Sequence, residues 1–209
     1  MPRGLLIESA VTNLALYSKQ IGNAAVWGLS NATIAANATT APDGNATADA
    51  LVEAATTGQR NVYYVMALTA QAYTASVFVK AGTRNSVLLN IYDGVANHGV
   101  YVNLLTGAIG STYAPVVGAV VACPNGWFRV SITFTPAAGT WSFDIYPTVG
   151  TSAGGETYTG SVGNALYLWG MQVEGGTIAT SYIPTVGAAA ARAADAVSIA
   201  ASAFPLSAV

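Results

Sequence analysis

Short, mainly apolar, strand-like stretches recur along this chain. They are bounded by clusters of Gly, Asn, Pro and Thr. The clearest runs are YYVMALT, YTASVFVKA, SVLLNIYDG, GVYVNLLTG, GWFRVSITFTP, TWSFDIYPTVG and ALYLWGMQVEGG. Short strands separated by turn residues in this rhythm are typical of all-β sandwiches. The pattern therefore predicts an all-β fold, an antiparallel β-sandwich.

Two of the runs show the period of two that half-buried strands have. In the first, one face of the expected strand carries Tyr73, Ala75, Val77 and Val79, and the other carries Thr74, Ser76, Phe78 and Lys80. In the second, the apolar set is Phe128, Val130, Ile132 and Phe134, alternating with Trp127, Arg129, Ser131 and Thr133. Each run is expected to bury one face.

Two segments are candidates for helix instead. They are DALVEAA at residues 49–55 and the alanine-rich stretch from Gly187, because alanine has the highest intrinsic helix propensity. We expect one β-sandwich domain over residues 1–186 and a short C-terminal extension over residues 187–209. The extension is poor in large apolar groups, which suits a linker or docking tail, with a disordered end as the alternative.

The composition favours an assembled protein. The chain has 209 residues, enough for a core that needs no external staples, and only 8% are charged while 53% are hydrophobic. A surface with so little charge has weak colloidal repulsion, so a homo-oligomer that covers apolar surface is expected. A trimer would bury the edges of three sandwiches, although the sequence has no heptad repeat to support it.

Charge and hydropathy argue against nucleic acid and membranes as partners. The seven basic residues are scattered and the formal charge is −2, so there is no patch to neutralise a run of phosphates. No apolar stretch reaches about 18 residues, and MPRGLLIES lacks the features of a signal peptide. We expect neither membrane insertion nor export by a recognisable signal.

Several blocks, in their order, resemble a known group of proteins. They are GLLIESAVTNLALYS, ANATTAPDGNATADALVE, YTASVFVKAG, NGWFRVSITFT, ALYLWGMQVEGGTIATSYIPT and ARAADAVSI. Over residues 4–199 they are similar to the repeated module of phage tail-fibre and head-fibre (head spike) virion proteins. That module in turn resembles carbohydrate-binding jelly rolls of the concanavalin-like or galactose-binding type.

The resemblance implies a jelly-roll fold, location in the virion and other virion proteins as partners. It implies a structural role as a head fibre, a tail fibre or spike, or a capsid decoration subunit that displays the module on the particle. The alternative is a carbohydrate-binding module that recognises a host surface glycan. A third reading, a polysaccharide depolymerase fragment, would need a groove with paired acids.

A glycan site is expected near the hairpin IYDGVANHGVYV. Sugar-binding sites combine aromatic rings with polar side chains that hydrogen-bond hydroxyl groups. The candidate ligand-binding residues are Tyr92, Asp93, Asn97, His98 and Tyr101, with the two tyrosines as exposed rings. The alternative is a plain Asp-Gly hairpin turn with a solvated histidine. Trp127 and Trp169 lie inside strand runs, where a large ring more often fills the core.

No catalytic set is recognisable, so we expect no enzyme. The acids Asp93, Asp144, Glu156 and Glu174 show no pairing motif for glycoside hydrolysis. A serine triad would have His98 as its base, but the sequence has no Gly-x-Ser-x-Gly elbow. We expect no cofactor. Structural calcium is the one candidate ion, and the acids available to it are Glu8, Asp43, Asp49, Glu53 and Glu174.

The single cysteine, Cys123, excludes an intrachain disulfide and a zinc site built from cysteine pairs. Its apolar surroundings predict a buried small hydrophobe. The triplet Asn-Ala-Thr at Asn31, Asn37 and Asn45 matches a glycosylation acceptor, but the same residues suit polar turns. The turn interpretation is preferred because nothing indicates a secretory pathway.

Overall fold

The apolar runs all form strands in the computed structural model, which describes residues 7–197. These strands are β6 (Asn61–Leu68), β7 (Tyr73–Lys80), β8 (Ser86–Tyr92), β9 (Asn97–Asn103), β12 (Trp127–Phe134), β13 (Gly139–Pro147) and β15 (Ala165–Gly175). Five further strands join them: β2 (Trp27–Ser30), β3 (Ala32–Thr39), β4 (Ala48–Glu53), β10 (Ile109–Tyr113) and β11 (Val117–Ala122). The prediction of strands from short apolar runs bounded by turn residues is confirmed.

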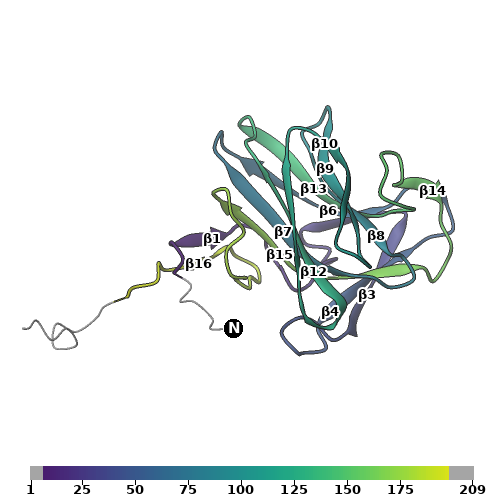
Figure 1. Ribbon diagram of the computed structural model, residues 1–209, viewed down its shortest axis with the longest axis horizontal. Coiled ribbons are helices and arrows are strands. Elements are labelled where there is room, and N and C mark those ends of the chain that lie inside the picture. The colour runs from purple at the N-terminus through teal and green to yellow at the C-terminus, as the bar shows by residue number, and fades with distance from the viewer. Residues whose placement is uncertain (1–6, 198–209) are drawn as a thin grey trace, which may run out of the picture.

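Two six-stranded antiparallel sheets form a sandwich (Figure 1). The first sheet has the order β10-β9-β8-β13-β6-β2, and the second has the order β11-β12-β7-β15-β4-β3. Two short ribbons complete the fold: β1 (Val11–Asn13) pairs with β16 (Ala190–Arg192), and β5 (Thr57–Gln59) pairs with β14 (Thr157–Thr159). The predicted all-β jelly-roll sandwich is confirmed.

The main core lies between the inner faces of the two sheets. The predicted inward set of β7, which is Tyr73, Ala75, Val77 and Val79, is buried there. The expectation that this run buries only one face is wrong, because Thr74 and Ser76 on the other face are also buried. From β12, Val130, Ile132 and Phe134 are buried and Phe128 packs partly buried against them. The first sheet contributes Val62, Leu89, Val100, Phe143 and Ile145. Each fully buried aliphatic side chain stabilises the fold by roughly 1.5–3 kcal/mol, so the sheets are held mainly by this layer.

A second apolar cluster lies on the outer face of the second sheet. Trp127 and Trp169 are buried in it, and Tyr182 lies 4.6 Å from the Trp169 ring. The Trp127 indole donates to the Thr40 carbonyl at 3.2 Å, and the Trp169 indole donates to the Thr47 hydroxyl at 3.1 Å. Both rings are therefore buried, as predicted, but beneath loops rather than between the sheets.

Cys123 packs against the same cluster and is only half-buried. The prediction of a fully buried cysteine is therefore wrong, because part of its side chain is exposed. The residue follows the edge strand β11 immediately, where no further strand covers it.

The candidate helix at residues 49–55, too short to count on from the sequence, is a strand. Residues 48–53 form β4, which is paired on one side with β3 and on the other with β15. A strand between two neighbours gains two ladders of hydrogen bonds, and this outweighs the modest helix propensity of alanine and glutamate. The pattern of the segment was too short to distinguish the two.

The alanine-rich segment is not helical over residues 187–197 either. Its residues 190–192 form β16 because β1 offers a partner strand, and residues 198–209 lie outside the described residues. Asn13 at the end of β1 is fully buried and donates to the carbonyls of Met171 and Ile183. This side chain ties β1, and with it β16, to β15. The domain boundary at residue 186 stays a prediction.

Candidate functional site

The hairpin between β8 and β9 is formed as predicted, with Tyr92 opposite Asn97 as its last pair. Asp93 closes the turn because one of its carboxylate oxygens accepts hydrogen bonds from the amides of Val95 and Ala96, both at 2.7 Å. These backbone hydrogen bonds, with a further one from His98, lower the pKa of Asp93 to about 2. The carboxylate is therefore ionised at any physiological pH.

Strand alternation divides the five candidate residues between three places. Tyr92 and Asn97 lie on the outer face of the first sheet, because they occupy the same side as Asn90 along β8 and β9. Asp93 and His98 lie at the end of the sandwich, at the opening between the sheets. Tyr101 lies further along the outer face, under residues 149–156.

Asp93 and His98 line a small cleft of about 230 Å³, which we name the hairpin cleft. Its other lining residues are Ile91, Pro115, Phe134, Thr135, Ala137 and Trp141. The cleft thus has an apolar wall and one polar end. Pockets for drug-sized ligands have volumes of roughly 300–1,000 Å³, so this one suits a single ring or a short side group.

The polar end of the hairpin cleft is held rigidly. His98 contacts Asp93 Oδ2 through Nε2 at 3.2 Å and the Ala114 carbonyl through Nδ1 at 2.9 Å. Its ring lies 5.9 Å from the ring of Trp141, whose indole donates to the Ala137 carbonyl at 3.1 Å. Both rings are therefore fixed before any ligand arrives, which limits the ordering cost of binding.

A row of polar side chains crosses the outer face of the first sheet beside Tyr92. We name it the outer polar row, and its members are Asn61, Asn90, Asn97, Ser142 and Asp144. Asp144 accepts hydrogen bonds from Ser142 at 2.9 Å, from Asn61 at 3.1 Å and from Asn90 at 3.3 Å. Asn90 also donates to the side-chain oxygen of Asn97 at 2.9 Å.

Two groups of this row have unusual surroundings. Asp144 is only 4% exposed, and its burial raises its pKa to about 6 against the hydrogen bonds that lower it. The side-chain oxygen of Asn90 is buried and has no hydrogen-bond partner among residues 7–197. Sequence reasoning missed Asn90 and Asn61. The signal was present, because one polar residue inside the apolar run SVLLNIY indicates a hydrogen-bonded partner.

Tyr101 does not present the exposed ring that the sequence predicted. It is fully buried against Leu88 and Tyr146, and its hydroxyl donates to Glu156. The backbone amide of Gly154 donates to the same hydroxyl at 3.2 Å. Desolvation by burial raises its pKa. The expectation of an exposed ring here is wrong because a loop distant in sequence covers it, and only Tyr92 keeps an exposed ring.

The acids considered for hydrolysis have different hydrogen-bonding partners. Glu174 is buried and accepts hydrogen bonds from Gln172 and Thr180. Glu156 is buried and accepts a hydrogen bond from the Tyr101 hydroxyl, and Asp144 belongs to the outer polar row. Asp93 lines the hairpin cleft. A glycosidase needs two carboxylates that face one sugar ring, roughly 5–9.5 Å apart.

Three of the acids considered for calcium are paired with cations: Glu8 with Arg192, Asp43 with Lys19, and Glu53 with Arg84. Over residues 7–197, His, Cys, Asp and Glu side chains form no group of three or more that could hold a metal ion. Structural calcium stays a prediction.

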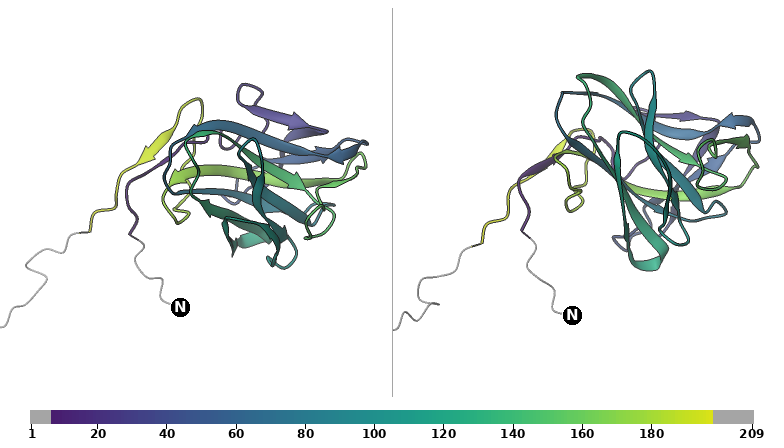
Figure 2. Two further views of the ribbon diagram at one scale, coloured as in Figure 1. Left: turned by 90° about the horizontal axis from the view of Figure 1, so that it is seen from above. Right: turned by 45° about the horizontal axis from the view of Figure 1, so that its top comes forward.

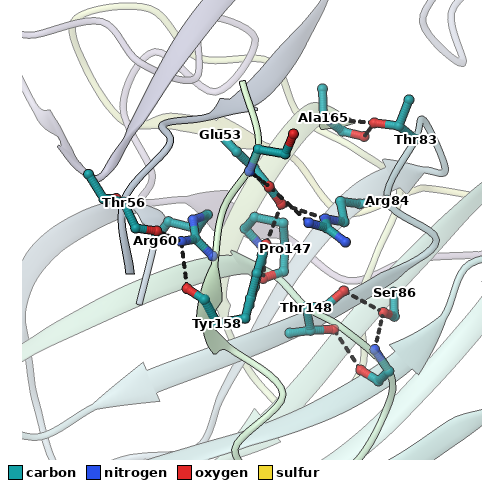
Figure 3. A network of polar contacts seen from close by, with 12 residues as sticks. Glu53, Thr56, Arg60, Thr83, Arg84, Ser86, Pro147, Thr148, Tyr158 and Ala165 are labelled. Atoms are coloured by element: carbon teal, nitrogen blue, oxygen red, sulfur yellow. Dashed lines mark hydrogen bonds and ion pairs between the residues drawn. The ribbon is translucent and has the colours of Figure 1, made fainter. Parts of the chain in front are cut away.

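A polar network fixes the end of the sandwich that carries β5 and β14 (Figure 3). Arg84 binds both oxygens of Glu53, at 2.6 and 3.0 Å, and the Tyr158 hydroxyl donates to the same carboxylate. The Tyr158 ring lies between two guanidinium groups, 3.8 Å from that of Arg60 and 4.7 Å from that of Arg84. Burial raises the pKa of Tyr158 to about 12.

This network holds Tyr158 and therefore the segment that continues from the loop over Tyr101. It is a structural clamp built on charged hydrogen bonds and stacking.

Among the described residues, no helix is long and apolar enough to cross a membrane.

The fold and the hairpin cleft define a jelly-roll sandwich with an amphipathic cleft at one end. No model of a known protein family matches the sequence, and no curated protein matches it. Among solved structures, this chain is similar to the CBM22-1–GH10 modules of endo-1,4-β-D-xylanase 10B from Clostridium thermocellum, complexed with xylohexaose. The identity is 12%, the TM-score is 0.46, and the alignment covers 82% of this chain and 30% of that one.

Two further structures are similar at comparable identity. The enzymatically active domain of tailspike protein 4 from bacteriophage CBA120 matches at 13% identity and a TM-score of 0.44, over 80% of this chain and 21% of that one. TmCBM61 in complex with β-1,4-galactotriose matches at 13% identity and a TM-score of 0.30, over 64% of this chain and 99% of that one. The chain spans less than a third of the first two structures.

Proposed function

We propose that this chain is a non-catalytic surface module of a bacteriophage particle, acting as a fibre, spike or decoration subunit. The observation that carries the proposal is the pairing of β1 with β16. It brings the two segments that flank the sandwich together at one end, away from β5 and β14 (Figures 1 and 2). A module held at one end presents the other end to the surroundings.

The paired ends are joined by several interactions. Val11 lies opposite Arg192 in the ladder, and Arg192 forms an ion pair with Glu8. The backbone amide of Asp195 donates to the Glu8 carbonyl at 2.9 Å, and the Glu8 amide donates back to the Asp195 carboxylate at 2.9 Å. The N-terminal segment at residues 8–11 and the C-terminal segment at residues 192–195 are thus joined to each other. A pull on either segment is transmitted to β15 through buried Asn13.

The virion context is supported by the ordered sequence blocks that resemble phage fibre modules, and by a surface with few charges. The absence of catalysis is supported by the hydrogen bonds within the fold that occupy all four acids. The buried carboxylates of Glu174 and Glu156 accept hydrogen bonds from groups of the fold itself. The two ring nitrogens of His98 contact the Ala114 carbonyl and the Asp93 carboxylate, and neither contacts a serine or cysteine among residues 7–197 that could act as a nucleophile.

The proposal is tested by particle composition. Phage particles carrying this gene are purified through a density gradient, and the chain is quantified by mass spectrometry against the major capsid protein. A fixed stoichiometry that persists through repeated purification supports the proposal. A chain that stays in the lysate and is absent from infectious particles contradicts it.

The hairpin cleft favours a second candidate function, recognition of a host surface glycan. Trp141 and Phe134 offer apolar contacts to a sugar ring, and Asp93 offers carboxylate oxygens to hydroxyl groups. Tyr92 lies just outside the cleft on the outer face, where an extended glycan could continue along Asn97 and the outer polar row.

A glycan array followed by calorimetry tests this candidate with three variants. Asp93→Asn keeps the shape of the turn and weakens hydroxyl recognition, and Tyr92→Ala removes the exposed ring. Val95→Ala, at the tip of the same hairpin and outside the cleft, is the matched control. Binding lost in Asp93→Asn and kept in Val95→Ala supports the candidate. Equal binding by all three variants excludes the cleft.

A further inference from the structure

The two large sheets have four edge strands, and three of them are protected against pairing with another chain. β2 has only four residues. β3 is interrupted between Ala35 and Thr39, where Asn37 adopts a positive φ of 55°. β10 is interrupted between Ile109 and Thr112, and the amide of Ser111 donates to the Thr151 carbonyl. Short strands, bulges and covering loops are common ways to blunt an exposed sheet edge.

The fourth edge strand, β11, has none of these protections. Its residues, Val117 to Ala122, pair with β12 in one uninterrupted register from Thr133 to Phe128. The strand VGAVVA contains no charge and no proline. Val117 and Val121 are 72% and 61% exposed on its outer side. A regular, uncharged and apolar edge strand is the kind that pairs with a further strand.

The backbone of β11 has hydrogen-bonding groups directed away from the sheet. Just beyond the strand, the amide of Cys123 donates to the Trp127 carbonyl at 2.8 Å. Antiparallel ladders alternate, so residues 117, 119 and 121 bond to β12, whereas Gly118, Val120 and Ala122 direct their amides and carbonyls outward. In the described part of the chain, residues 117–122 have no backbone hydrogen bonds beyond the ladder to β12.

We propose that β11 pairs with β11 of a second copy of this chain, antiparallel and around a twofold axis at Ala119. In this register Val117 lies opposite Val121 of the second copy, and Gly118 lies opposite Val120. The outward-directed groups of Gly118 and Val120 then bond to each other. The β11-containing sheets of the two copies join into one continuous twelve-stranded sheet. The same residues of each copy form the interface, as an isologous contact requires.

The sequence of β11 suits its own copy as the partner. Reversed about Ala119, the strand places valine against valine on the outer side, and no like charges face each other. Val121 also borders a hollow of about 730 Å³ that contains Ile178 on its rim, and Val117 borders another of about 380 Å³. In the proposed register Val117 of the second copy lies beside the larger hollow and covers apolar surface there.

The mass of the purified chain in solution tests the proposal first. Light scattering after size exclusion is expected to give twice the chain mass of 21.2 kDa. The double variant Val117→Lys and Val121→Lys should be monomeric, because it places lysine opposite lysine across the axis. The matched control, Val95→Lys with Val162→Lys, changes two similarly exposed valines outside β11 and should stay dimeric.

Hydrogen exchange locates the interface even if a variant folds poorly. In the native chain, the amides of Gly118 and Val120 should exchange about tenfold more slowly at high than at low protein concentration. The amide of Val121, bonded to β12, should not change. A native chain that is monomeric at about 100 µM, a trimer, a lysine variant that stays dimeric, or β11 amides that ignore concentration each overturns the proposal.

Discussion

Replacing Asp144 with asparagine should remove a large part of the pH dependence of stability. Burial raises the pKa of Asp144 to about 6, from 3.8 for an exposed aspartate. A carboxyl whose pKa is raised by folding binds its proton more tightly in the native state. Its contribution to stability is therefore fully present below pH 4 and is lost as the pH rises through about 6.

The magnitude follows from the pKa difference. A shift of about two units at about 1.36 kcal/mol each gives a loss of roughly 3 kcal/mol between pH 4 and pH 7.5 in the native chain. The Asp144→Asn variant lacks this loss because it cannot ionise.

The amide introduced at position 144 also brings an N–H group next to Asn90. The Asn90 oxygen could accept from it only if the Asn90 amide turned, which would break the Asn90 hydrogen bond to Asn97, so no net hydrogen bond is gained. Because the asparagine is neutral at every pH and avoids the buried charge, we expect Asp144→Asn to be more stable than the native chain by about 1–2 kcal/mol at pH 7.5 and less stable at pH 4.

Urea unfolding at pH 4, 5, 6 and 7.5, followed by tryptophan fluorescence, measures this difference. Asp93→Asn is the control, because the pKa of Asp93 is lowered to about 2 and its contribution is lost only as the pH falls below 4. The control should keep the native slope between pH 5 and pH 7.5. If Asp144→Asn shows the same slope as the native chain in that interval, the assignment of the buried titrating group is wrong.

Three further changes probe the clamp, the paired ends and the exposed ring. Glu53→Gln leaves Arg84 without its carboxylate and should lower the free energy of unfolding by about 2–4 kcal/mol in urea titrations; an unchanged midpoint would mean that the clamp contributes nothing. Asn13→Ala removes four buried hydrogen bonds and should release β16, seen as faster amide exchange at residues 190–192 than in the native chain; equal exchange would contradict the role of Asn13. Tyr92→Ala should change the unfolding free energy by less than about 0.5 kcal/mol, and a larger loss would show that the ring is packed rather than available to a ligand.

Short apolar runs bounded by turn residues predicted the strands and the fold class, and alternation in two of the runs predicted which residues face the core between the sheets. The hairpin at Asp93-Gly94 was predictable for a similarly local reason, since its turn chemistry is contained in a few residues. Local pattern therefore determined where strands begin and where the chain turns back.

What the sequence did not reveal depends on segments far apart in the chain. The segment at 49–55 has helix-forming residues, and only the neighbouring strands β3 and β15 make it a strand. Tyr101 alternates correctly to the outer face, yet residues 149–156 cover it. Trp169 is buried by Tyr182 and by a loop near Thr47. Long connections that fold over an outer sheet face leave no periodic signal.

The candidate site was predicted in part. Asp93 and His98 are brought together at a cleft, but the ring that completes it, Trp141, is almost fifty residues away in sequence and on another strand. Asn90 and Asp144 meet only because β8 and β13 are neighbours in the sheet. Such partners follow from strand order, which a period of two does not encode.

The most direct test of the account is accessibility on intact particles. A short epitope inserted after Gly163, in the exposed turn that precedes β15 near the β14 end, is compared with the same epitope placed after Ala194, beside the paired ends. Gold-labelled antibody should bind purified particles through the first epitope and bind much less through the second. Equal labelling of both epitopes, or no labelling of particles that contain the chain, would contradict a module anchored at its β1–β16 end and displayed outward.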